Sequence, residues 1–187
     1  MAIYLLRHGQ SIANRDLLFS GTSDHPLTDL GRQQARQAGK GMKGWHFEHV
    51  FTSTLSRTIE TADIFLLAAG ATVHSRQACP ELNERDFGLY ESRSQSPERP
   101  PEEREICKRI SNDVEFVPPD GESMRQTHMR ARAFLETVMR PLGDGNALIV
   151  GHGNVLRSMT LHALGWPIDL LPEMPSRNCL ITRLHIR

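Results

Sequence analysis

Two histidines in this sequence each follow a short apolar run that is typical of a buried strand. Residues 2–6 lead into Arg7 and His8, and residues 147–150 lead through a glycine into His152. In an open α/β sheet, ligands bind beyond the carboxyl ends of the parallel strands. We therefore expect the two imidazole rings to face one pocket, although they stand far apart in the chain.

Two more ionisable residues, Arg57 and Glu84, extend this candidate cluster. Arg57 stands at the start of a predicted helix, and Glu84 lies in a polar loop. The guanidinium groups of Arg7 and Arg57 match the oxygens of a phosphate. A neutral imidazole is a competent nucleophile toward phosphorus, and nearby cations disfavour its protonated form. A carboxyl group across the pocket could protonate the leaving oxygen and then accept a proton from water.

These residue types predict phosphoryl transfer. Arginines and helix N-termini would spread the charge of the phosphoryl group, so the chemistry needs no metal. Each residue alone has an ordinary explanation as a structural histidine, a solvated arginine or a loop acid. Their joint occurrence, each at the edge of a strand or helix, favours the site. Glu81 is a competing carboxylate close to Glu84.

The elements that must position this cluster alternate between strand and helix. We expect strands at 2–6, 49–53, 71–75, 147–150 and 178–185, and helices at 28–40, 55–69, 102–111, 124–138 and 154–164. Thr28 and Ser123 are typical helix N-caps, and Gly70 is a typical residue after a helix end. Residues 88–120, rich in proline, glutamate and arginine, predict a cap-like excursion over the site.

Length and composition limit the class of protein to which this chain can belong. The chain has 187 residues, and formal charges that sum to zero, which predicts one domain over 1–187 and gives no sign of nucleic-acid or membrane binding. No membrane span or signal peptide is visible, so the cytoplasm is the expected compartment. Three scattered cysteines give no metal or disulfide framework. His46 and His49 are expected before the second strand as surface or packing residues rather than metal ligands.

A family resemblance runs through nearly the whole chain. Its segments are 6–14, 19–21, 26–35, 53–62, 82–88, 121–123 and 151–157. In this order they resemble the motifs of the histidine phosphatase superfamily, in the branch that includes phosphoglycerate mutase. Gln10 stands where many members carry Glu, and Ser92 stands where Gly is common. Neither position belongs to the expected phosphate cluster.

The resemblance implies a fold and a role for each site residue. The fold would be a phosphoglycerate mutase-like, three-layer α/β/α sandwich with a mostly parallel central sheet. His8 would be phosphorylated during turnover, and Glu84 would act as general acid and then as general base. The phosphoryl group would be bound by Arg7, Arg57 and His152. The phosphate and substrate entrance would be formed by Asn14, Gly21, Gly153 and Asn154. No cofactor is implied, and the family commonly forms homodimers.

Three functions remain open, and hydrolysis of a small phosphorylated metabolite is favoured. By resemblance, mutases use a long insertion with paired tyrosines and paired arginines. This chain is short, has two tyrosines and has no adjacent arginine pair. Asn154 favours a phosphoglycerate mutase, which is the alternative enzyme. A non-catalytic phosphate-binding or regulatory module is the third possibility, although the expected catalytic residues are all present.

Overall fold

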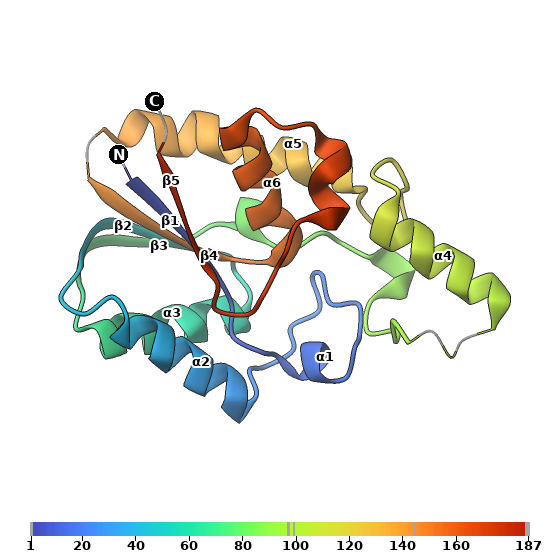
Figure 1. Ribbon diagram of the computed structural model, residues 1–187, viewed down its shortest axis with the longest axis horizontal. Coiled ribbons are helices and arrows are strands. Elements are labelled where there is room, and N and C mark those ends of the chain that lie inside the picture. Colours follow the sequence, from blue (N-terminus) through green and yellow to red (C-terminus); the bar gives the residue numbers. More distant parts are fainter. Residues whose placement is uncertain (1, 97, 99, 144, 186–187) are drawn as a thin grey trace.

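The computed structural model describes residues 2–96, 98, 100–143 and 145–185, and its centre is a five-stranded sheet (Figure 1). The strands are β1 (Ala2–Arg7), β2 (His46–Thr52), β3 (Thr72–Ala78), β4 (Asn146–Gly151) and β5 (Ile181–His185). Their order across the sheet is β3-β2-β4-β1-β5. The first four strands run parallel, and β5 pairs antiparallel with β1. The predicted mostly parallel sheet is confirmed.

Helices cover both faces of this sheet. α2 (Asp29–Lys40) and α3 (Ser56–Ala69) lie on one face, and α5 (Met124–Phe134) and α6 (Gly153–Leu164) lie on the other (Figure 1). α5 continues through a π-helical turn, Leu135–Met139. The short α1 (Ile12–Arg15) and α4 (Pro101–Asn112) lie beyond the carboxyl ends of the strands. Four 3-10 segments complete the chain: Pro80–Leu82, Gly88–Tyr90, Arg140–Leu142 and Ile168–Glu173. The three-layer sandwich is confirmed.

The central strands are apolar throughout because both of their faces are buried. On β1, Ile3 and Leu5 pack in the core on the α5 and α6 side. Tyr4 and Leu6 pack in the core on the α2 and α3 side. Successive side chains of a strand point to opposite faces, so a sheet covered on both sides needs unbroken apolar runs. Within the described ranges, no helix has the length and apolar character needed to cross a membrane.

The helix ends follow the predicted signals. The Thr28 hydroxyl accepts the Gly31 N–H at 3.1 Å, which caps α2. Ser123 and Gln126 form a reciprocal capping box at the start of α5. Gly70 ends α3 with a φ of 57°, in the left-handed region that favours glycine. Ser92 also has a left-handed φ, of 60°, a conformation that favours glycine, the residue that the family resemblance implies there.

The boundaries of β2 and β3 differ from the prediction. β2 begins earlier than expected because His46 pairs with Thr72 of β3. β3 runs on to Ala78, which pairs with Thr52 at the other end of the ladder. His46 therefore lies within a strand rather than before it, and His49, at the start of the predicted strand, lies in the middle of β2. Backbone pairing between neighbouring strands decides these ends, and the composition of a single segment does not reveal it.

Two further differences lie close to the candidate site. β5 begins only at Ile181, because Cys179 has a φ of 54° and cannot belong to a strand. α1 lies between the predicted strand at 2–6 and the predicted helix at 28–40, where the sequence predicts no helix. Ser11 and Asn14 form a capping box around this single turn of helix. So short a helix has no apolar periodicity by which the sequence could reveal it.

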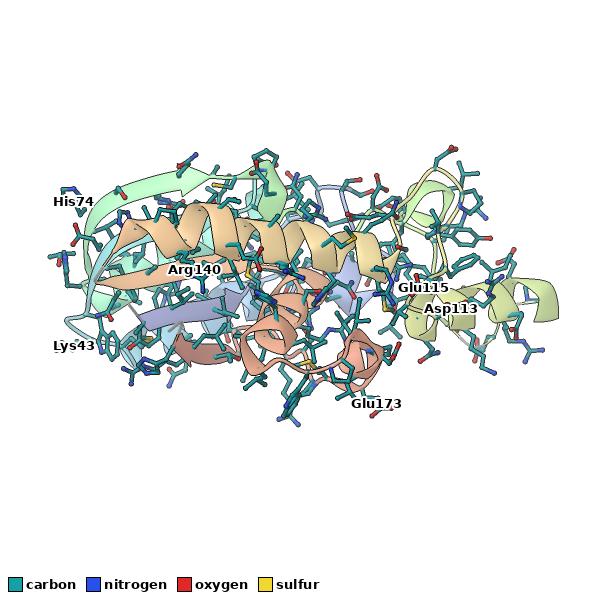
Figure 2. All side chains as sticks on the ribbon, turned by 90° about the horizontal axis from the view of Figure 1, so that it is seen from above. Lys43, His74, Asp113, Glu115, Arg140 and Glu173 are labelled. Atoms are coloured by element: carbon teal, nitrogen blue, oxygen red, sulfur yellow. The ribbon has the colours of Figure 1, made fainter. Side chains whose placement is uncertain are left out.

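Arg85 anchors the excursion over the end of the sheet. It is fully buried, and its donors reach three backbone carbonyl oxygens: those of Ile110 and Glu122 at 2.7 Å each and that of Phe116 at 3.1 Å. Burial lowers the pKa of Arg85 to about 10. Figure 2 shows the next part of the excursion, with Asp113 and Glu115 beside α4, at the opposite end of the molecule from His74.

Replacing Arg85 with lysine is expected to destabilise the fold by about 2–4 kcal/mol, because an ammonium group cannot reach all three carbonyl oxygens and leaves buried acceptors unpaired. The free energy of unfolding in urea measures this. Arg36→Lys, the same change at an exposed position on α2, is the matched control and should alter stability little. Equal stability of the two variants would show that Arg85 does not anchor the excursion.

Candidate active site

The carboxyl ends of β1 and β4 bring the two predicted histidines together. Arg7 pairs with Gly151 in the parallel ladder, and the backbone N–H of His8 donates to the Gly151 carbonyl oxygen at 3.0 Å. The ring centroids of His8 and His152 lie 5.1 Å apart. Residues from opposite ends of the chain occupy one place because the two strands are neighbours in the sheet.

His8 is almost wholly buried, with 3% of its surface exposed. Its Nδ1 atom lies 2.7 Å from the Gly9 carbonyl oxygen, which can only accept a hydrogen bond. Nδ1 therefore carries the proton of the neutral ring, and Nε2 keeps a free electron pair. Burial lowers the pKa of His8 well below its usual value, and the cations of Arg7 and Arg57 lower it further. His8 is thus neutral and nucleophilic at pH 7.

His152 has protein partners at both ring nitrogens. Arg57 Nε donates to Nδ1 at 3.3 Å, so Nε2 carries the proton and donates to Ser53 Oγ at 2.8 Å. Burial lowers the pKa of His152 well below its usual value, and the nearby Arg57 contributes. The structure thus places His152 as a neutral ring beside His8, with its orientation set by Arg57 and Ser53.

Arg57, only 1% exposed, is held by the backbone of residues 21–23. Its Nη2 donates to the Gly21 carbonyl oxygen at 2.7 Å and its Nη1 to that of Ser23 at 2.8 Å. Two of its N–H groups stay available, since guanidinium has five. Gly21, expected at the substrate entrance, contacts Arg57 through its carbonyl, while its N–H donates to the Glu91 carboxylate at 3.0 Å.

Arg7 presents an unused donor. Its Nη1 donates to the carbonyl oxygen of Ser176, whereas its Nε is buried with no hydrogen-bond partner among the described residues. A buried, unpaired donor costs about 1–3 kcal/mol, so a phosphoryl oxygen that accepted this N–H would recover that free energy. Burial lowers the pKa of Arg7, and the Glu84 carboxylate opposes the shift.

Asn14 is oriented by a residue that the sequence reasoning missed. Its Oδ1 accepts the Ser11 N–H at 3.2 Å and the Asn178 side-chain N–H at 3.0 Å. Asn178 also donates to the His8 carbonyl oxygen at 2.9 Å. With Oδ1 occupied, the Nδ2 of Asn14 is left as a donor for a ligand. The only signal for Asn178 in the sequence is a polar residue at the start of the last predicted strand.

Glu84 lies at the N-terminus of α6. Both of its carboxylate oxygens are 3.2 Å from the backbone N of Asn154, and Oε1 also accepts the Arg85 N–H at 2.9 Å. Glu84 is 8% exposed and lines a cavity. Glu81, the competing carboxylate, is exposed and does not line this cavity. The geometry therefore favours Glu84.

The cavity has a volume of about 350 Å³ and extends from the strand ends to the excursion. Its wall near the strand ends and α6 is formed by Arg7, Asn14, Glu84, Gly153, Asn154 and Arg157. Its outer wall includes Phe19, Phe87, Gln95, Ile110, Ser111 and Asn112. The residues that line the cavity do not include the candidate residues His8, Gly21, Arg57 and His152. The end of α4 thus borders the cavity.

This arrangement combines the groups that phosphoryl transfer requires. Arg7 and Arg57 supply positive charge for a tetrahedral anion, His8 supplies a neutral nucleophile, and Glu84 supplies a carboxyl group at the cavity wall. Within the described ranges, no group of three or more His, Cys, Asp or Glu side chains is arranged to hold a metal ion.

Comparison with known proteins agrees with this geometry. The family model of the histidine phosphatase superfamily (branch 1) matches residues 3–187. A protein of Yersinia pestis (strain Pestoides F) named "Probable phosphoglycerate mutase GpmB" is 31% identical over 185 residues, which cover 98% of this chain and 84% of that protein.

Solved structures give the same result. The alpha-ribazole phosphatase of Shigella flexneri superposes with a TM-score of 0.83 at 29% identity, covering 100% of this chain and 91% of that one. Bacillus stearothermophilus YhfR superposes with a TM-score of 0.82 at 25% identity, with the same coverage of 100% and 91%. The chain belongs to branch 1 of the histidine phosphatase superfamily.

Proposed function

We propose that this protein hydrolyses a small phosphorylated metabolite through a phosphohistidine formed at His8. The observation that carries the proposal is the state of the His8 ring. The Nδ1–H of His8 donates a hydrogen bond to the Gly9 carbonyl oxygen, and the pKa of the ring is lowered well below its usual value. Nε2 is therefore a free nucleophile near the cations of Arg7 and Arg57. Such a ring can attack phosphorus without first losing a proton.

The first step forms a bond between His8 Nε2 and phosphorus and breaks the bond from phosphorus to the leaving oxygen. Glu84 gives its proton to that oxygen, so the product leaves as a neutral alcohol. Arg7, Arg57 and Asn14 donate hydrogen bonds to the phosphoryl oxygens, and His152 supports Arg57. The positive charge of the arginines stabilises the negative charge of the phosphoryl group, so we infer that no metal takes part.

The second step returns the enzyme to its starting state. Glu84, now ionised, takes a proton from a water molecule, and the oxygen of that water attacks the phosphohistidine. The bond from phosphorus to Nε2 breaks, and inorganic phosphate leaves with the ring of His8 neutral again. The N-terminus of α6, at Gly153, adds a backbone donor and a favourable dipole at this place, whereas the N–H of Asn154 holds the Glu84 carboxylate.

The substrate must fit a cavity whose outer wall is mixed in character. Phe19, Phe87 and Ile110 give apolar surface, whereas Gln95 and Asn112 give hydrogen-bonding groups. This lining suits a polyol or a riboside that carries one phosphate. The Shigella relative named alpha-ribazole phosphatase supports hydrolysis of such a compound. The relative named phosphoglycerate mutase, together with Asn154, supports mutase activity as the second candidate.

We expect the purified protein to release inorganic phosphate from a panel of phosphomonoesters faster than it interconverts 2- and 3-phosphoglycerate, and to keep its activity in excess chelator. Phosphate release and coupled interconversion assays on one preparation measure this. Faster interconversion would establish a mutase. Binding of phosphate without any turnover would establish a non-catalytic module, and loss of activity in chelator would reject metal independence.

A further inference from the structure

The carboxylate of Glu91 joins the excursion to the backbone that holds Arg57. Glu91 directly follows the 3-10 segment Gly88–Tyr90. Its Oε1 accepts the N–H groups of Gly21 at 3.0 Å, Thr22 at 3.2 Å and Phe87 at 3.0 Å. Its Oε2 accepts those of Gly21 at 3.1 Å and Ser23 at 3.1 Å. One side chain thus binds successive N–H groups of the loop at residues 21–23.

The opposite side of the same loop faces Arg57. In the peptide between Gly21 and Thr22, the N–H donates to Glu91 and the carbonyl oxygen accepts from Arg57. The N–H and C=O of a trans peptide point in opposite directions, so fixing one fixes the other. A negative charge at the N–H also polarises the carbonyl and strengthens its bond to the guanidinium. The N–H of Ser23 also donates to Glu91, and its carbonyl oxygen, in the next peptide, accepts from Arg57.

This chain of contacts ends at the catalytic histidines. The Nε of Arg57 donates to Nδ1 of His152, whose ring lies beside that of His8. Burial lowers the pKa of Arg57, and the carboxylates of Glu84, Asp24 and Glu91 oppose that shift. Glu91 therefore acts on Arg57 through the peptide bridge and through its charge.

The fit between Glu91 and the loop is close. A Cβ atom on Gly21 would lie 2.4 Å from Glu91 Oε1 and 2.0 Å from the Arg85 carbonyl oxygen, so no larger residue could stand there. The Glu91 carboxylate is occupied by backbone N–H groups of the loop at residues 21–23 and of Phe87. We therefore expect any effect of Glu91 on turnover to pass through the loop and Arg57.

We propose that Glu91 is a positioning residue: its carboxylate holds the peptides of residues 21–23 so that the Arg57 guanidinium is fixed for a phosphoryl group. This inference rests on the proposed function, because it gives Arg57 the role of phosphoryl ligand. It also links the excursion to the phosphate site, since Glu91 belongs to the segment 88–120.

The test replaces Glu91 with glutamine, which keeps the size of the side chain but substitutes an amide group for one acceptor oxygen. We expect kcat/KM with an aryl phosphate to fall about 10- to 100-fold, the scale on which misplacement of a positioning group acts. The affinity for inorganic phosphate, measured by titration calorimetry, should fall with it. Glu105→Gln, the same change at an exposed position of α4, is the control and should behave like the wild type.

A double-mutant cycle with Arg57→Lys distinguishes positioning from general damage to the fold. If Glu91 acts through Arg57, Glu91→Gln will cost far less in the Arg57→Lys background than in the wild type. Equal costs in both backgrounds, or kcat/KM and phosphate affinity within about twofold of wild type, would overturn the proposal. Thermal unfolding shows whether each variant is folded. If Glu91→Gln is not, Glu91→Asp replaces it, because the shorter carboxylate should also lose its hydrogen bonds to the loop.

The two levels of inference can fail separately. If the wild type binds phosphate but turns over neither an aryl phosphate nor any phosphomonoester of the panel, the proposed hydrolase function is wrong. The calorimetric cycle then still decides the role of Glu91, because it needs no turnover. Unchanged phosphate affinity in Glu91→Gln, with normal wild-type turnover, would instead reject Glu91 and leave the hydrolase function intact.

Discussion

His8→Ala is expected to lower kcat for an aryl phosphate by at least about 1,000-fold, the scale on which loss of a nucleophile acts in covalent catalysis. The reason is that His8 combines a free Nε2 with the nearby cations of Arg7 and Arg57. Steady-state phosphate release measures the loss.

The variant should remain folded, since it loses only the ring contact with His152 and the hydrogen bond to the carbonyl oxygen of the adjacent Gly9. Circular dichroism and the unfolding midpoint check this point. Asn178→Ala provides a useful comparison, because it removes a hydrogen bond to the His8 carbonyl oxygen but leaves the ring in place. Turnover of His8→Ala close to that of the wild type would remove the mechanism proposed above.

Glu84→Gln should have the second largest effect, and its size should depend on the leaving group. With an alkyl phosphate, whose leaving oxygen needs a proton, loss of the general acid should cost about 100- to 10,000-fold in kcat/KM. With a p-nitrophenyl ester, which leaves without a proton, the loss in kcat/KM should be much smaller. A series of esters with graded leaving-group pKa measures this dependence.

Glu81→Gln is the matched control for this prediction, because Glu81 is exposed and lies outside the cavity lining. It should leave kcat/KM unchanged for every ester. The assignment would have to be reversed if Glu81→Gln showed the leaving-group dependence and Glu84→Gln did not. A loss that is the same for all esters would mean that Glu84 binds the substrate but does not donate a proton.

Much of the fold was predictable because its signals are local. The apolar runs of β1 and β4 show that both faces of the sheet are covered, and the caps at Thr28 and Ser123 mark helix starts. The ends of β2 and β3 were not predictable, because they depend on pairing between strands. The start of β5 differs from the prediction because Cys179, with its left-handed φ, lies in a segment whose composition is typical of a strand.

The candidate site divides in the same way. His8 and His152 could be placed together from the sequence, since each follows a strand and parallel strands end at one edge. The contacts that orient them could not. Asn178 and Glu91 enter through hydrogen bonds between segments distant in the chain, and nothing local distinguishes such polar residues from solvated ones.

The most direct measurement is to trap the intermediate. The wild type is mixed with a radiolabelled phosphomonoester and quenched in alkali, in which phosphohistidine survives, and the labelled peptide is sequenced by mass spectrometry. We predict label on the peptide that contains His8, and none in His8→Ala. Label on any other residue, or wild-type turnover with no labelled protein at any quench time, would contradict a phosphohistidine at His8.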